Sequence, residues 1–158
     1  MIYRDYQQKM HDEFQDAWAG GARAVLGVAP TGSGKGALVA GNVDAFDGPS
    51  CAVAHRQELV GQLSMSLCRY GVEHRIVAAE ATVREIVRQQ LDEFGRSFYR
   101  PGSIHGVASV DTLVLLPEND RWLPNVGLWI QDECHHLTRE GNTKGSVGKW
   151  MKALNRMP

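Results

Sequence analysis

The sequence predicts an α/β domain with a mainly parallel sheet, because short apolar runs alternate with helical segments along the chain. Leu59, Leu63 and Leu67 recur every four residues, which predicts an amphipathic helix. Residues 50–54 form a short apolar run typical of a buried strand. A glycine-rich turn at 29–36 joins an apolar run to a helical segment. Right-handed crossovers then bring the carboxyl ends of the strands to one edge, where functional groups are expected.

The remaining elements follow the same alternation. Apolar residues between Tyr6 and Trp18 fall on one helical face, and Gly20 and Gly21 end that helix. Residues 22–29 are apolar throughout except for Arg23, which predicts a buried strand leading into the glycine-rich turn. In chain order we expect helices at 6–18, 35–46, 57–70, 83–94 and 147–154, and strands at 22–29, 50–54, 75–79, 104–109 and 126–131.

Length and composition restrict the class of protein. The 158 residues suit one domain spanning 1–158. Seventeen Lys and Arg against eighteen Asp and Glu leave a formal charge of -1, so a nucleic-acid site must be a local patch. No apolar run approaches the ~18 residues of a membrane span, so no membrane partner is expected. The three cysteines are odd in number and widely spaced, which favours free thiols in a cytoplasmic protein.

The glycine-rich turn is the most informative stretch, because it lies between a predicted strand and a predicted helix. Glycines let consecutive N–H groups point inward as an anion nest, and the helix N-terminus adds positive charge. Gly36 stands where Ser or Thr normally supplies a hydroxyl to Mg²⁺. The alternative is a plain glycine turn. The residues predicted to hold the phosphates are Pro30, Thr31, Gly32, Ser33, Gly34, Lys35 and Gly36.

A second site follows the apolar run that ends at Gln131, where Asp132 and Glu133 are adjacent. Asp132 is expected to hold Mg²⁺ through water, and Glu133 to polarise the attacking water. The alternative is a helix cap followed by an acidic first turn. Zinc is disfavoured because the adjacent side chains of residues 134–136 cannot all point at one metal.

Taken in order, these motifs resemble the first RecA-like domain of superfamily 2 helicases of the DEAH/DExH type, and most closely the compact helicases of phages and restriction systems. The resemblance covers nearly the whole chain. Residues 4–8 look like the Arg-x-Tyr-Gln motif, and residues 54–62 look like motif Ia. Residues 107–113 look like the Ala-Ser-Val-Gln-Thr-Leu element, with Asp111 replacing Gln. Residues 132–135 look like a DECH version of motif II.

The resemblance implies a RecA-like three-layer P-loop sandwich that uses ATP and Mg²⁺ in a bacterial or phage-infected cell. It implies catalytic roles for Lys35, Asp132 and Glu133. It also implies nucleotide contacts from Arg4 and Gln7, with Gln7 reading the adenine. The resemblance further implies a nucleic-acid partner, with DNA favoured over RNA. The residues implied to contact it are Arg56, Gln62, Ser109 and Thr112.

The resemblance also implies parts that these 158 residues do not contain. The family continues into a Ser/Thr-Ala-Thr motif and a second RecA-like domain, and the strand before that motif lies between the strands of motifs I and II. We therefore expect a sheet that is incomplete at its C-terminal end, and a second polypeptide or RecA-like domain as partner. The expected activity is ATP hydrolysis coupled to movement along nucleic acid or to its unwinding. The alternatives are a split or degenerate nucleotide- and DNA-binding module without turnover on its own, and a P-loop kinase or small-molecule ATPase.

Overall fold

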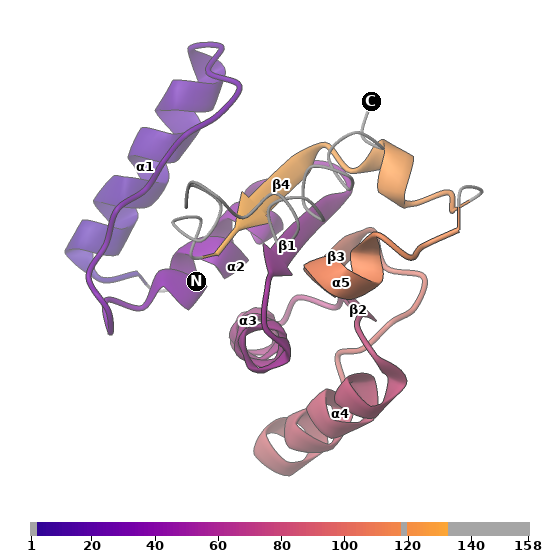
Figure 1. The fold of residues 1–158 in the computed structure, drawn as a ribbon. Helices are drawn as coiled ribbons and strands as arrows, with labels where there is room; N and C mark the ends of the chain where they lie inside the picture. The colour runs from indigo at the N-terminus through magenta and orange to yellow at the C-terminus, as the bar shows by residue number, and fades with distance from the viewer. Residues whose placement is uncertain (1–2, 118–119, 133–158) are drawn as a thin grey trace, which may run out of the picture.

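The computed structural model describes residues 3–117 and 120–132, and Figure 1 shows how they fold. The sheet is entirely parallel, with strand order β2-β3-β1-β4. The predicted α/β class is therefore confirmed, and it is consistent with a RecA-like fold. The strands are β1 Ser50–Ala54, β2 Arg75–Val77, β3 His105–Ser109 and β4 Leu128–Gln131. The helices are α1 Asp5–Ala19, α2 Lys35–Ala45, α3 Gln57–Arg69, α4 Glu80–Phe94 and α5 Val110–Leu113, with a 3₁₀ turn at Leu123–Asn125.

One face of the sheet packs against the long helices. Alternate residues of the strands, such as Ala52 and Val107, join α2 and α3 in a core that includes Val43 and Leu67. Ile86 adds a contact from α4. Every residue of β1 is buried, as is usual for a central parallel strand covered on both faces.

The other face carries a smaller core. Cys51 and Val53 of β1 point into it, and α5 contributes Leu113. Trp122 closes this layer, and its indole N–H donates to the Ile104 carbonyl at 2.7 Å. The sheet therefore lies between two apolar layers, which is the three-layer arrangement implied by the sequence resemblance.

A buried polar network joins α3 to α4. His74 accepts the Ser64 hydroxyl at Nε2 (2.7 Å) and donates through Nδ1 to the Val72 carbonyl (2.9 Å). The Gln90 amide donates to Ser64 and accepts the Phe98 N–H at 2.8 Å. Burial lowers the pKa of His74 to about 4, so the ring is neutral at pH 7. Each polar group has a partner, and so the network fixes one packing of these elements.

The predicted strand at 22–29 is wrong. These residues form no strand, and Leu26 and Val28 are 70% and 83% exposed. In Figure 1 the segment runs back along α1, away from the sheet, and Gly27 lies against the Phe14 ring. The N–H groups of residues 23–29 donate no hydrogen bond to any other described residue. An apolar run becomes a strand only beside a strand that can pair with it. Among the described residues β4 pairs with β1 alone, so the segment 22–29 has not joined the sheet beside β4.

The other predicted elements that lie in the described part of the chain are confirmed within a few residues of their bounds. The short helix α5, which starts directly after β3, was not among the predicted elements. The helix expected at 147–154 and the catalytic candidate Glu133 lie outside the described residues.

Candidate nucleotide-binding site

The glycine-rich turn forms a closed loop at the start of α2. Gly32 and Gly34 have φ values of 79° and 76°, a region that favours glycine. The Ser33 N–H donates to the Pro30 carbonyl at 3.2 Å and closes the turn. Gly34 is the N-cap residue, so the loop ends at the positive end of the α2 dipole.

Lys35 folds back over this loop. Its ammonium lies 3.3 Å from the Ala29 carbonyl and 3.5 Å from the Pro30 carbonyl. Carbonyl oxygens are weaker partners for an ammonium group than phosphate oxygens are. A phosphate that enters the loop would therefore replace these carbonyls as the partner of the Lys35 ammonium.

Ser33 provides a separate test of whether the loop suits a phosphate group. Its hydroxyl oxygen is buried and has no hydrogen-bond partner among the described residues. A buried hydroxyl without a partner is costly, and a polyphosphate would satisfy it. The positive end of the α2 dipole, the Lys35 ammonium and the Ser33 hydroxyl together fit a nucleoside triphosphate.

The first turn of α1 holds the loop in place. The Gln7 amide donates to the Ser33 carbonyl at 2.9 Å and to the Gly34 carbonyl at 3.3 Å, and its oxygen accepts the Arg4 N–H at 3.0 Å. The Tyr6 hydroxyl donates to the same Ser33 carbonyl at 2.5 Å. In this conformation the amide of Gln7 is fully used within the protein, and its role toward adenine stays a prediction.

The hydrogen bonds from Tyr6 and Gln7 of α1 to the loop form a clamp, and this clamp requires Gly34. A Cβ atom at Gly34 would lie 2.5 Å from the Gln7 amide nitrogen. The glycine therefore serves both the left-handed backbone and the close approach of α1. The motif around Gln7 and the phosphate loop, 26 residues apart in sequence, form one unit in space.

The carboxyl ends of three strands bring the other predicted residues to one edge. Ala54 at the end of β1 is in register with Ser109 at the end of β3. The Asp132 N–H donates to the Val53 carbonyl at 3.1 Å, which places Asp132 on the other side of β1. Arg56 follows β1 as the exposed N-cap residue of α3.

A family model described as the type III restriction enzyme, Res subunit, matches residues 1–157. The chain belongs to this family. No protein in the curated comparison matches it. Membership in the Res-subunit family establishes a helicase-type ATP-binding module. It implies ATP binding that typically depends on Mg²⁺, and it suggests an interaction with nucleic acid. Among the described residues, no helix is long and apolar enough to cross a bilayer.

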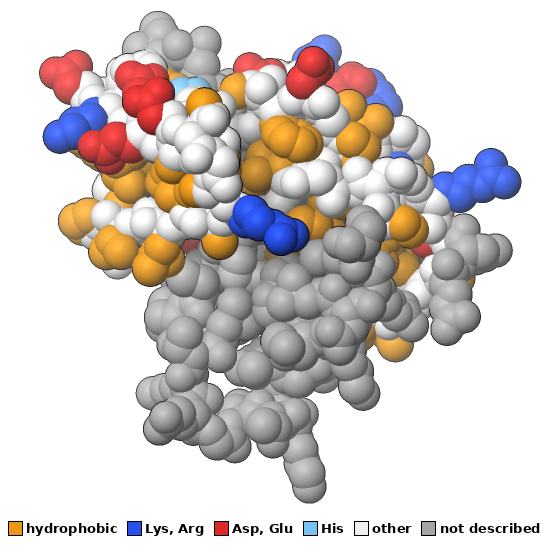
Figure 2. Space-filling view, turned by 90° about the horizontal axis from the view of Figure 1, so that it is seen from above, with side chains coloured by type: hydrophobic (Ala, Val, Ile, Leu, Met, Phe, Trp, Pro, Cys, Tyr) orange, Lys and Arg blue, Asp and Glu red, His pale blue; other side chains and the backbone are white. Residues whose placement is uncertain are grey.

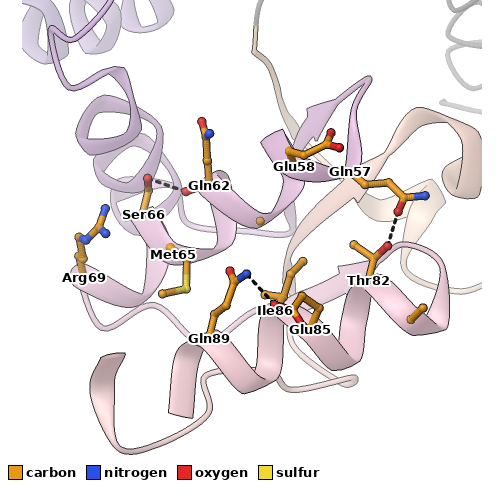
Figure 3. A pocket seen from close by; sticks show the side chains of 12 residues that line it. Gln57, Glu58, Gln62, Met65, Ser66, Arg69, Thr82, Glu85, Ile86 and Gln89 are labelled. Atoms are coloured by element: carbon orange, nitrogen blue, oxygen red, sulfur yellow. Dashed lines mark hydrogen bonds between the residues drawn. The ribbon is translucent and has the colours of Figure 1, made fainter. Parts of the chain in front are cut away.

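Two of the nucleic-acid candidates of this Res-subunit domain form a helix cap. The Ser109 hydroxyl accepts the Thr112 N–H at 3.2 Å and donates to the Thr112 hydroxyl at 3.0 Å. The pair thus orders the start of α5 at the carboxyl edge. Gln62 lies elsewhere: it projects from the second turn of α3 and lines a groove between α3 and α4 (Figure 3). The structure therefore groups Arg56, Ser109 and Thr112 without Gln62.

The donor set for a metal ion in the Res-subunit domain is small. No group of three or more His, Cys, Asp or Glu side chains that could hold a metal occurs in the described ranges. Mg²⁺ bound together with nucleotide phosphates uses only one or two carboxylates, and Asp132 at the end of β4 provides one. The residues present therefore fit Mg²⁺ bound jointly with a nucleotide.

Sequence reasoning assigned no site role to Tyr6. It was placed on the apolar face of the first helix, but it is 42% exposed and bonded to the phosphate loop. Its position next to Gln7, in a motif already expected to approach the nucleotide, is the signal that could have identified it.

Proposed function

We propose that this chain is the ATP-binding half of a superfamily 2 DNA helicase or translocase, in which ATP hydrolysis drives movement along DNA or its unwinding. The observation that carries the proposal is the shared carboxyl edge of β1, β3 and β4. Asp132 follows β4, which is next to β1 and its Arg56 and two strands away from β3, which ends at Ser109. A change at the nucleotide can therefore reach the nucleic-acid side through neighbouring strand ends.

Each residue has a distinct task in this proposal. Lys35 leaves the loop carbonyls and binds the β- and γ-phosphates, and the loop N–H groups hold the remaining phosphate oxygens. Asp132 holds Mg²⁺, which neutralises charge on the phosphates when it is bound. Glu133 accepts a proton from the water that attacks the γ-phosphate.

Nucleic acid would bind at the N-terminal end of α3 and at the α5 turn. The guanidinium of Arg56 is exposed there and suits a phosphate oxygen. Contacts of this kind position a strand without reading its sequence. The proposal therefore expects binding that is independent of sequence and weakens as salt rises.

Steady-state ATP hydrolysis with and without single-stranded DNA tests the function. We expect DNA to raise the rate, and Glu133→Gln to abolish hydrolysis while ATP binding remains. Arg56→Ala should weaken the DNA stimulation and leave the DNA-independent rate unchanged. Hydrolysis that DNA does not alter would favour a small-molecule ATPase instead.

The exposed segment at 22–29 supports the second candidate, a split module that needs another polypeptide segment for turnover. Figure 2 shows hydrophobic side chains gathered at the left of one face, over α1 and the segment that follows it. Val25, Leu26 and Val28 are the exposed apolar side chains of this segment. A strand inserted beside it would pair its free N–H groups and cover these side chains.

Hydrogen exchange of residues 23–28 tests this second candidate. A polypeptide carrying a second RecA-like domain should slow exchange of these amides and raise the rate of ATP hydrolysis. The amides of β1 serve as an internal control because this strand already lies between β3 and β4. Full DNA-stimulated hydrolysis by the 158-residue chain alone would overturn the split-module reading.

A further inference from the structure

Three consecutive backbone amides at the start of α2 are left for a ligand. The N–H groups of Gly34, Lys35 and Gly36 donate to no other described residue. The first N–H groups of a helix need partners from outside the helix, and consecutive N–H groups can form a nest for an anion. The affinity of the loop for phosphate therefore depends on the direction in which these N–H groups point.

The direction of the Gly34 N–H is set by the carbonyl of Ser33. Both groups belong to one planar trans peptide bond, so they point to opposite sides of the chain. The Ser33 carbonyl accepts the Tyr6 hydroxyl at 2.5 Å and the Gln7 amide at 2.9 Å, both from α1. A carbonyl oxygen has two lone pairs, and here both are used. The two donors of α1 thus turn the Ser33 carbonyl toward α1 and the Gly34 N–H away from it.

Arg4 is connected to the loop through the same tyrosine hydroxyl. Its guanidinium Nη1 donates to the Tyr6 oxygen at 3.2 Å, and the hydroxyl in turn donates to the Ser33 carbonyl. A charged donor polarises the hydroxyl that it binds, and hydrogen bonds in a chain strengthen one another. The side chains of Arg4 and Tyr6 are both exposed, so burial in a core does not explain their arrangement. The guanidinium therefore reaches the loop through one intervening hydroxyl.

We propose that Arg4 and Tyr6 are positioning residues of the phosphate loop. Arg4 polarises the Tyr6 hydroxyl, and this hydroxyl holds the Ser33 carbonyl so that the Gly34 N–H faces the phosphate chain. The proposal rests on the proposed function, because it takes the loop as the site of the phosphates. It assigns both side chains to the affinity for the phosphate chain, whatever base the nucleotide carries. A residue that contacts only the base would not affect the binding of a ligand without a base.

Calorimetric titration with tripolyphosphate, which has neither base nor ribose, provides the test. We expect Tyr6→Phe to lower its affinity about fivefold, as for the loss of one neutral hydrogen bond. Arg4→Gln should lower it about threefold in the wild type and not at all in the Tyr6→Phe background, as for coupling within one hydrogen-bond network. A direct attraction between Arg4 and the ligand would persist in that background. Unchanged affinity in Tyr6→Phe, or equal losses from Arg4→Gln in both backgrounds, would overturn the proposal.

The nuclear magnetic resonance of the Gly34 amide nitrogen in the ligand-free protein gives a second readout, which no ligand charge affects. A hydrogen bond to a carbonyl polarises its peptide bond, so Tyr6→Phe should shift this resonance. Arg4→Gln should shift it in the same direction, and only while Tyr6 is present. Gln8→Ala, on the exposed side of α1, is the control and should leave it in place. An unshifted resonance in Tyr6→Phe would overturn the proposal, whereas a wild type that binds neither tripolyphosphate nor ATP would overturn the proposed function as well.

Discussion

The sheet and the phosphate-loop side of this domain are built in different ways. All five residues of β1 are buried between two apolar layers, and the strand pairs with β3 on one side and with β4 on the other. The segment 22–29 is of similar apolar character, yet Leu26 and Val28 are 70% and 83% exposed and the N–H groups of 23–29 have no partner within the described ranges. Similar residues thus form a core strand in one place and an uncovered segment in another.

Because of this difference, the residues that stabilise the domain and the residues that form the candidate nucleotide site lie in different regions. The apolar burial that stabilises the domain lies around β1, β3 and α3. The phosphate loop is held mainly by the hydrogen bonds of Tyr6 and Gln7 and by the fold-back of Lys35. We therefore expect substitutions in the sheet region to change the free energy of unfolding, and substitutions in the loop region to change nucleotide affinity.

The first prediction compares the same substitution in the two regions. Leu67→Ala removes a completely buried side chain from the core and should lower the free energy of unfolding by about 2–5 kcal/mol. Leu26→Ala removes a side chain that is 70% exposed and should change it by less than about 0.5 kcal/mol. Urea unfolding measures both. Similar losses would show that the segment 22–29 is covered in solution.

The second prediction concerns the pH dependence of the sheet region. Burial holds the pKa of His74 at about 4, against an ordinary value of 6.5. Between these values the unfolded chain binds a proton that the folded chain does not, so stability is full above pH 6.5 and falls toward pH 4. The loss is at most about 3 kcal/mol, since one pKa unit corresponds to about 1.4 kcal/mol.

Urea unfolding at several pH values, compared between wild type and His74→Gln, isolates this effect. The variant cannot titrate at residue 74, so it should be less stable at pH 7 and should lose less stability than the wild type on acidification. Parallel pH profiles for the two proteins would contradict the assignment of the buried neutral ring.

The contrast between the two regions also explains what the sequence could predict. The leucine repeat of α3 and the apolar run of β1 gave correct elements because packing agrees with local pattern there. The run at 22–29 gave a wrong strand because an apolar pattern indicates a need for burial and does not identify the neighbour. Pairing depends on strands that are distant in sequence, and no local pattern reveals them.

The same limit applies to the candidate site. The phosphate loop was predicted because glycines, lysine and the following helix are neighbours in sequence. The approach of Ser66 to Gly36 joins residues 30 positions apart on two helices, and no local pattern reveals it. The engagement of the Gln7 amide by the loop was likewise invisible before the fold was known.

The third prediction concerns the loop region directly. Lys35→Ala removes the cation that lies over the loop, and a charge-assisted hydrogen bond contributes about 1.5–3 kcal/mol. We expect ATP affinity to fall by roughly 10- to 100-fold, with the free energy of unfolding nearly unchanged. Calorimetric titration with ATP and Mg²⁺, paired with urea unfolding, measures the two. Equal binding by the variant and the wild type would exclude Lys35 from the nucleotide site.

The last prediction addresses the clamp between α1 and the loop, where the smallest effect is expected. Gln7→Ala removes the amide that donates to the carbonyls of Ser33 and Gly34, and one neutral hydrogen bond contributes about 1 kcal/mol. ATP affinity should fall about fivefold, because the loop must be ordered as the nucleotide binds. Gln8→Ala is the matched control, since the Gln8 amide donates to Asp12 on the exposed side of α1, away from the loop. If both variants bind ATP as the wild type does, the loop holds its shape without the Gln7 amide, and this prediction is wrong. A preference for ATP over GTP that is lost in Gln7→Ala together with ATP affinity would assign Gln7 to the adenine.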